Sequence, residues 1–352
     1  MEFVALSDPS VRLAFWLGAS SVTITLILIF RVVMLRLFLL RRERHSSQFT
    51  ERWQPPLLRC IMGDHVEFPT LHANDEMDLI YLAVHFHETL RGDAKDRINQ
   101  ALQILELGPR LRSILQDGSL DERLAAATAL GHMQDHLSWD VLKSLLNDGS
   151  SALSVIAARS LVLIDAEAAS TLVIPVIISR RDWPTPKLVT MIKESAVLQQ
   201  EFLQQVARDI QHRQPYLPRM MRLVEAIRPN QPLPFIRDLL NISDDAELIS
   251  AGLRLTRDPE DLDLIRGRAD DRHLAVQVQV ASALGRLGTE ADVPRLIALL
   301  NSREWWVRYR AAQSLINLPF LGRDSITQII GETNDPFARD MLKQVLAETV
   351  TP

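Results

Sequence analysis

The sequence predicts an all-α fold, an α-solenoid of helix pairs preceded by one transmembrane helix. Three observations predict it. Only 13 of the 352 residues are glycine and 6% are aromatic, which favours helices in a chain rich in Leu, Ala and Arg. One uncharged apolar run lies near the N-terminus, and an apolar residue recurs with a nearly constant period over most of the remaining chain.

The N-terminal part contains one segment long and apolar enough to cross a membrane. Residues 13–30 carry no charge, and after Arg31 the apolar pattern resumes up to residue 40. About 20 apolar residues span the hydrocarbon core of a bilayer. We therefore expect residues 13–40 to form a transmembrane helix with a basic cytosolic flank, and residues 1–12 to form a short extracytoplasmic N-terminus.

The charges around this segment predict its orientation. A cleavable signal peptide carries its positive charges before the apolar run, whereas here Glu2 and Asp8 precede it. Five arginines lie at its C-terminal end, namely Arg31, Arg36, Arg41, Arg42 and Arg44, against Arg12 alone on the other side. Because positive residues stay on the cytosolic side, we expect a single-pass protein of the inner (cytoplasmic) membrane with its C-terminal part in the cytosol.

Residues 41–73 are predicted to be a linker. They show no clean helical period and contain Pro55, Pro56 and Pro69, and proline commonly interrupts regular structure. The repeat solenoid is expected to cover residues 74–352.

An apolar anchor residue recurs after the linker. The spacing is 31 residues at every step except one of 30, and the anchors are Leu130, Leu161, Ile192, Leu223, Leu253, Leu284, Leu315 and Leu346. A second apolar run lies between anchors, as in residues 141–148, 234–241 and 293–301. Such a period is typical of stacked repeats, so we expect about eight helix pairs whose stacking buries one continuous core.

Other residue types recur at a fixed number of positions before an anchor. Arg123, Arg308 and Arg339 each lie seven residues before an anchor, and Trp183 and Trp306 each lie nine before one. We expect Arg308 to bond to turn carbonyls or carboxylates. The match with Trp183 favours packing of Trp306 at a junction between repeats.

These segments resemble HEAT repeats, specifically the short bacterial HEAT-like kind also seen in phycobilin lyases. The resemblance is carried by VRYRAAQSL, with Arg308 at the family's arginine position, and by VASALGRLGTEADVPRLIALLN, where Gly288 closes one helix and Pro294 opens the next. It is sharpest over residues 124–164 and 275–318. It is degenerate between about residues 192 and 255, where we expect distorted repeats.

A second resemblance is carried by the block HFHETLRGDAKDRINQALQILEL, followed by RLAAATALGHM, SWDVLKSLL and RRDWPTP. It looks like a group of bacterial membrane-tethered HEAT proteins found with inner-membrane glycosyltransferases that make surface polysaccharide. The resemblance implies an accessory subunit or regulator of exopolysaccharide synthesis, and it transfers no role to any single residue.

The sequence predicts no catalytic residue and no cofactor. It contains no phosphate-binding Gly-rich loop, nucleophile elbow or Cys/His dyad, and the single cysteine, Cys60, cannot form an internal disulfide. A formal net charge of -5 with mixed signs gives no reason to expect a nucleic-acid partner, which requires a basic face.

The histidines do not predict a metal site. His85 and His87 are two residues apart, whereas a helical zinc pair is four apart. His132 and His136 have that spacing, but Gly131 is expected to end the helix before His136.

The residues most suited to binding a protein are an aromatic and arginine group near the C-terminus. Trp305 and Trp306 lie close to Arg303 and Arg310, and tryptophan and arginine are enriched at the energetic centres of interfaces. Because solenoids bind partners on the surface formed by the second helices, a further candidate surface consists of Lys143, Arg237 and Arg295.

Three functions are compatible with these features. We expect a non-enzymatic scaffold or accessory subunit that binds protein partners at the cytosolic membrane face, with a membrane glycosyltransferase as the candidate partner. The alternatives are a regulator that docks a soluble signalling protein and a HEAT-fold enzyme of the lyase type. The last requires a pocket with a convergent acid and base, which the sequence does not reveal.

Overall fold

A computed structural model describes residues 9–64, 66–72, 75–90, 92–230 and 232–350 of the chain. The described residues form helices and turns and contain no β-strand, so the predicted all-α class is confirmed. Most of the expected extracytoplasmic segment, residues 1–8, lies outside the described residues. The chain divides into two compact units, Met1–Val141 and Leu142–Pro352.

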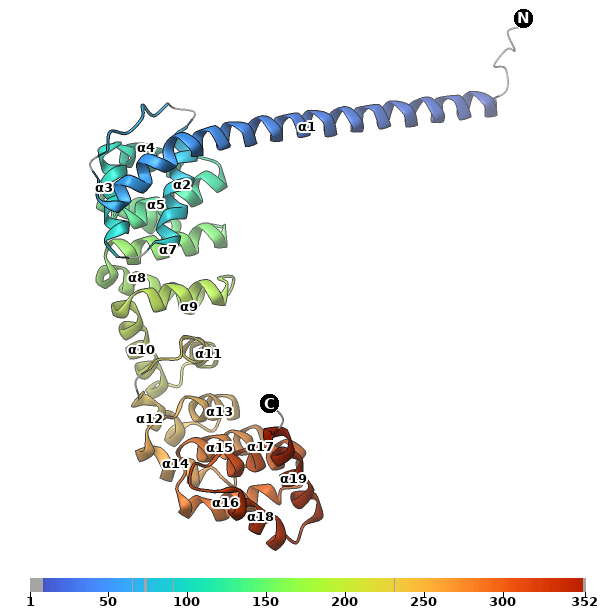
Figure 1. The fold of residues 1–352 in the computed structure, drawn as a ribbon, viewed down its shortest axis with the longest axis vertical. Helices are drawn as coiled ribbons and strands as arrows, with labels where there is room; N and C mark the ends of the chain where they lie inside the picture. Colours follow the sequence, from blue (N-terminus) through green and yellow to red (C-terminus); the bar gives the residue numbers. More distant parts are fainter. Residues whose placement is uncertain (1–8, 65, 73–74, 91, 231, 351–352) are drawn as a thin grey trace, which may run out of the picture. The chain divides into compact units, whose positions relative to one another are not determined.

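The first unit begins with the long helix α1, Pro9–Met62 (Figure 1). It contains one stretch, Trp16–Arg36, that is long and apolar enough to cross a membrane, and none of the stretch is buried against the rest of the protein. Its 21 residues correspond to about 32 Å of helix, close to the thickness of a bilayer core.

The expectation that residues 41–73 form an irregular linker is wrong for residues 41–62, which continue α1 without a break. Phe49, Trp53 and Leu57 recur four residues apart and are 5%, 0% and 1% exposed, since this face of α1 packs on α3, Asp93–Ile104. Burial of that face outweighs the helix-breaking effect of the two prolines inside α1. The exposed apolar stretch and the first layer of the folded unit are therefore parts of one helix.

Four further helices build the first unit: α2, Glu76–Thr89, then α3, then α4, Leu107–Asp117, and α5, Leu120–His132. The Arg97 guanidinium on α3 donates to the carbonyl of Ile61 at 2.6 Å, which satisfies one of the open carbonyls at the end of α1. A capping box of Ser119 and Glu122 starts α5. The short 3-10 helix η1, His136–Ser138, and α6, Trp139–Leu145, follow.

The second unit consists of alternating first and second helices. The first helices are α7 (Ser151–Ile164), α9 (Thr185–Glu194), α11 (Leu217–Ile227), α13 (Ala246–Leu255), α15 (Leu274–Leu287), α17 (Trp305–Asn317) and α19 (Pro336–Val350). The second helices are α8 (Ala166–Ser179), α10 (Ala196–Gln211), α12 (Phe235–Ile242), α14 (Leu262–Gly267), α16 (Val293–Leu300) and α18 (Arg323–Glu332). Neighbouring first helices lie side by side throughout the unit (Figure 1).

The predicted anchors identify the first helices correctly. Each of the eight lies on an odd-numbered helix, from Leu130 on α5 to Leu346 on α19. All are at most 2% exposed except Leu346, which is half-buried. On α19 the neighbouring Val345 is buried instead.

The arginines in phase with the anchors share one structural role. Arg308 donates to the carbonyls of Ser302 and Arg303, at 2.9 and 3.2 Å, as the sequence predicts. Arg123 and Arg339 likewise donate to carbonyls six to eight residues earlier, those of Leu115 and Thr333. Each arginine therefore ties the start of a first helix to the end of the preceding helix.

Other arginines tie successive repeats of the second unit together. Arg180 donates to the Asp148 carbonyl at 2.8 Å, and Arg219 donates to the Ile178 carbonyl at 3.1 Å. The carbonyls lie at or just after the ends of α6 and α8, where no intrahelical donor is left. The guanidinium supplies that donor from the next repeat.

Gly285 on α15 marks the closest approach of two first helices. A Cβ atom at this position would lie 2.5 Å from Oγ and 3.0 Å from Cα of Ser314 on α17, so the layers could not keep their spacing. Gly285→Ala should therefore destabilise the second unit by about 2 kcal/mol, as overpacking does.

The matched control is Gly331→Ala on α18, where a Cβ would meet nothing within 4 Å and should stabilise the helix by about 0.5 kcal/mol. Urea unfolding of the detergent-solubilised protein measures both. Equal midpoints for the two variants would contradict the close approach of α15 and α17.

Because the apolar stretch and the first folded layer lie on one helix, we expect the stability of the first unit to depend on the last turns of α1. Deletion of residues 1–44 removes the apolar stretch and keeps Trp53 and Leu57, so α3 should stay protected from hydrogen exchange. Deletion of residues 1–62 also removes both buried side chains, each worth about 3 kcal/mol or more, and should expose α3 to exchange. Equal protection of residues 93–104 in the two deletions would show that α1 contributes nothing to the unit.

Candidate functional site

Three aromatic side chains form an exposed cluster at the start of α17. The Trp305 ring stacks on the Tyr309 ring, with centroids 4.9 Å apart and planes 10° apart. The Trp306 ring stands at 90° to that of Trp305, with a centroid distance of 4.6 Å. Trp305 is 42% exposed and Trp306 is 68% exposed. Rings already packed on one another lose little conformational freedom on binding, so the cluster is a preorganised contact surface.

The expectation that Trp306 packs at a repeat junction is wrong. Its phase equivalent Trp183 is 3% exposed, and the Trp183 indole N–H donates to Oγ of Ser154 at 3.2 Å. Trp183 lies in the turn before α9, which starts at Thr185, so its side chain can fold onto the preceding repeat. Trp306 is already inside the first turn of α17, and the helix holds its ring on an exposed face.

The two arginines predicted beside the tryptophans are both exposed. Arg303 lies in the turn before α17, and Arg310 lies on α17 and donates to Oε1 of Gln313 at 3.0 Å. The Tyr309 hydroxyl donates to Glu348 on α19 at 2.9 Å, and this hydrogen bond raises the pKa of Tyr309. The structure thus adds Tyr309, which the sequence reasoning missed, to the two predicted tryptophans, while Arg303 and Arg310 are their neighbours along the chain.

The cations predicted on the second helices have different environments. Lys143 is exposed on α6. Arg237 donates to Asp261 at 2.8 Å and lies 3.4 Å from Glu260, and Arg295 lies 3.9 Å from Asp292. Two of the three positions therefore contact carboxylates of this chain.

Asp292 is one of those carboxylates, and it has a structural role. Its side chain is fully buried, and Arg266 of the preceding repeat donates to both its oxygens at 2.7 and 2.8 Å. The Arg266 hydrogen bond lowers the pKa of Asp292 to about 2. Because the carboxylate also accepts the Thr289 N–H, it fixes the start of the second helix and the register of the neighbouring repeat.

The arginines predicted to flank a membrane are described in part. Arg31 and Arg36 are exposed on α1, and Arg36 ends the apolar stretch. The side chains of Arg41, Arg42 and Arg44 lie outside the described residues.

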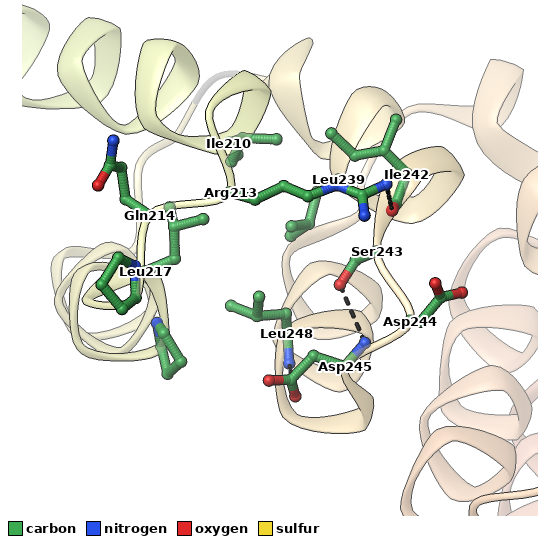
Figure 2. Close-up of a pocket in the computed structure, with 12 residues that line it drawn as sticks. Ile210, Arg213, Gln214, Leu217, Leu239, Ile242, Ser243, Asp244, Asp245 and Leu248 are labelled. Carbon is green, nitrogen blue, oxygen red and sulfur yellow. Dashed lines mark hydrogen bonds between the residues drawn. The ribbon is translucent and has the colours of Figure 1, made fainter.

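A pocket of about 270 Å³ opens between two interhelix turns of the second unit (Figure 2). Its apolar wall comes from the buried side chains of Ile210, Leu217, Leu239 and Leu248. Arg213 lies across the opening and donates to the Ile242 carbonyl at 3.0 Å. The pocket can accept an apolar side chain, and it offers no carboxylate and base at one point for catalysis.

The pocket lies in the stretch of degenerate repeats, residues 192–255. The buried face of α11 carries Met220 and Met221 in place of alanines, and Arg213 and Arg228 adopt left-handed backbone angles at the ends of α10 and α11. The diluted alanine pattern predicts distorted repeats over these residues, but it gives no signal for the pocket itself.

The structure pairs two histidines that the sequence analysis treated separately. His87 on α2 and His132 on α5 stack with ring centroids 4.5 Å apart and planes 4° apart, and they are 1% and 8% exposed. Burial, together with the charge of Lys95, lowers the pKa of His87 to about 4. Among the described residues, no group of three His, Cys, Asp or Glu side chains could hold a metal ion.

Residues 245–316 match a family model described as HEAT repeats. This segment of the chain is HEAT-like. The match covers α13 to α17, and no curated protein matches the chain. The short bacterial subtype stays a prediction.

Solved structures of Kap121p resemble this chain in fold. A crystal structure of Kap121p bound to Nup53p is 16% identical, with a TM-score of 0.50, over 83% of this chain and 37% of that chain. A crystal structure of Kap121p is 15% identical, with a TM-score of 0.49, over 84% of this chain and 37% of that chain. This chain thus spans 37% of the length of those proteins, and the likeness concerns the fold alone.

The His87–His132 stack predicts acid sensitivity of the first unit. The pKa of His87 falls from 6.5 in the unfolded chain to about 4 in the fold, so folding favours the neutral ring. The stabilisation is complete above pH 6.5 and is lost as the pH falls to about 4, by up to roughly 3 kcal/mol.

Melting of the solubilised protein between pH 7 and pH 4 tests this expectation. His87→Phe keeps an aromatic ring and should reduce the dependence of the melting temperature on pH. The exposed control His85→Gln should leave that dependence unchanged. If the melting temperature of His87→Phe fell with pH as steeply as that of the wild type, His87 would not be the cause of the acid sensitivity.

Proposed function

We propose that this protein is a membrane-anchored, non-enzymatic scaffold that binds protein partners at the cytosolic membrane face. One observation carries the proposal: α1 holds both the exposed apolar stretch Trp16–Arg36 and the buried residues of the first folded layer. An unpartnered apolar helix surface of this length is stable in a bilayer rather than in water.

The continuity of α1 also sets the distance between bilayer and scaffold. Between Arg36 and Phe49 the helix advances by about 20 Å. A helix transmits position better than a flexible linker does. The first folded unit is therefore held near the headgroups, where the juxtamembrane arginines favour the cytosolic side.

The partner-binding part of the proposal is supported by the exposed aromatic cluster of α17. Large aromatic side chains beside arginines are the composition of interface hot spots. HEAT-like solenoids present such surfaces on rigid stacked helices. The resemblance to membrane-tethered HEAT proteins makes a polysaccharide-synthesising glycosyltransferase the candidate partner, and co-purification from native membranes would identify it.

Membrane extraction tests the anchor. The protein should remain in the pellet after alkaline carbonate treatment, and Ile27→Arg with Leu28→Arg should release it, because each charge at the bilayer centre costs about 3 kcal/mol. Ile27→Leu with Leu28→Ile is the matched control and should stay in the pellet. Recovery of the wild-type chain in the carbonate supernatant would overturn the proposal.

Protease treatment tests the orientation. The second unit should be resistant in sealed spheroplasts and cleaved in inverted vesicles. Cleavage from the outside of spheroplasts would place the scaffold on the opposite face.

A further inference from the structure

Arg31 is a charged residue that lies inside the apolar stretch of α1. The stretch Trp16–Arg36 contains two charged residues. Arg36 ends it, whereas Arg31 precedes that end by five residues, which is about 7.5 Å of helix. The Arg31 side chain is exposed, and none of the stretch is buried against the rest of the protein. If the stretch crosses a bilayer as proposed, Arg31 lies within the hydrocarbon core and faces lipid or another membrane protein.

Three other polar side chains of the stretch are satisfied by their own helix. The Ser20 hydroxyl donates to the Leu17 carbonyl at 2.9 Å. The hydroxyls of Thr23 and Thr25 each donate at 2.8 Å to a carbonyl four residues earlier. A guanidinium carries five N–H donors and a full charge, and the helix carbonyls around it already accept backbone N–H groups. The helix alone therefore cannot satisfy Arg31.

No carboxylate of α1 can neutralise Arg31. The stretch Trp16–Arg36 contains neither Asp nor Glu, and the nearest carboxylates along the chain are those of Asp8 and Glu43. Glu43 follows Arg31 by twelve residues, which corresponds to about 18 Å of helix. A second copy of the chain does not supply the counter-charge, because two parallel α1 helices would place two Arg31 guanidinium groups at the same depth. The counter-charge must come from lipid headgroups or from another protein.

The direction of the side chain favours a protein carboxylate over the lipid headgroups. In an α-helix every Cα–Cβ bond tilts toward the helix N-terminus, and long side chains follow it. In the proposed orientation this direction leads from Arg31 toward the bilayer centre, away from the cytosolic headgroups. Arg36 lies at the end of the stretch and can reach those headgroups, whereas Arg31 would have to extend about 7.5 Å against the tilt of its own Cα–Cβ bond. A carboxylate at the depth of Arg31 neutralises it without that extension.

The residues around Arg31 form an aliphatic face of α1. Residues three and four positions apart share a face of a helix. The residues at these positions are all more than half exposed, and they are Ile27, Leu28, Met34 and Leu35. Arg36 lies about 140° around the helix from Arg31, so the two charges are on different faces. The face of Arg31 thus combines aliphatic side chains with one central charge, which suits a helix that is apolar except for one carboxylate.

We propose that this face of α1 is the contact surface for a transmembrane helix of a partner protein, and that the partner helix carries an Asp or Glu at the depth of Arg31. The inference rests on the proposed membrane anchor and names the chemistry of a partner within the bilayer. The low dielectric of the hydrocarbon core strengthens the attraction between the two charges, and no water competes for it. Aliphatic side chains of both helices pack around the pair and exclude lipid.

Model transmembrane peptides test the inference on the full-length protein in phosphatidylcholine vesicles. The peptides are Leu- and Ala-rich helices of about 21 residues that carry one Asp, or one Asn as the neutral control, at the depth of Arg31. A photo-crosslinker at Ile27 reports contact with the Arg31 face. A photo-crosslinker at Ile29, about 160° around the helix from Arg31, reports contact with the opposite face. Crosslinking at Ile27 should be at least about fivefold greater with the Asp peptide than with the Asn peptide, and Ile29 should show no such preference.

Substitutions at the two arginines identify the charge responsible. Arg31→Gln should remove the preference for the Asp peptide, and Arg31→Lys should keep it, because lysine keeps the positive charge. Arg36→Gln is the matched control and should leave the preference unchanged. Equal crosslinking of the two peptides would show that lipid phosphates neutralise Arg31, and a preference that persists in Arg31→Gln would assign it to another charge. Either result would overturn the inference.

Carbonate treatment of the same vesicles separates this inference from the proposed anchor. Each variant should stay in the pellet, which excludes loss of insertion as the cause of a lost preference. Wild-type protein that stays in the pellet but crosslinks both peptides equally would contradict the inference and leave the anchor in place. Wild-type protein in the supernatant would contradict the anchor and the inference together.

Discussion

The structure depends on one constraint: a helix pair of this kind buries its apolar face only against the neighbouring pairs. The anchors Leu161, Leu284 and Leu315 are fully buried, and a buried leucine contributes roughly 2 kcal/mol when it leaves water. That burial exists only while neighbouring first helices remain in contact. Small residues make the contact possible, as where Gly285 meets Ser314. Stability is thus a property of the stack, and no pair holds its conformation alone.

Arginine side chains supply the hydrogen-bond donors that apolar packing does not provide at the helix ends. The apolar seam fixes how close the layers lie, but it leaves the carbonyls at helix ends without donors. Arg180, Arg219 and Arg308 supply those donors, and Arg266 neutralises the buried Asp292. Most arginines near the layer edges are therefore committed to the fold. The exposed Arg303 and Arg310 beside the tryptophans stand out for that reason as residues available to a partner.

The continuity of α1 joins the first folded unit to the exposed apolar stretch Trp16–Arg36. Trp53 is fully buried in the first unit, stacked between Phe49 and Phe68 at centroid distances of 5.8 and 6.4 Å. The same helix carries the exposed apolar stretch toward the N-terminus. A force or tilt applied to the apolar stretch would reach the core of the first unit through a single hydrogen-bonded helix. A flexible tether would transmit neither the force nor the tilt.

The sequence by itself determined the helical class, the repeat period and the residues that start and end the pairs, because each follows from the spacing of apolar, small and capping residues along one helix. Leu253 and Pro294 occupy the expected positions for that reason. Only the tertiary structure decided which faces meet. It stacked His87 on His132, buried Trp183 while exposing Trp306, and extended α1 through its two prolines. Those outcomes depend on packing against side chains distant in sequence, and the local period contains no information about them.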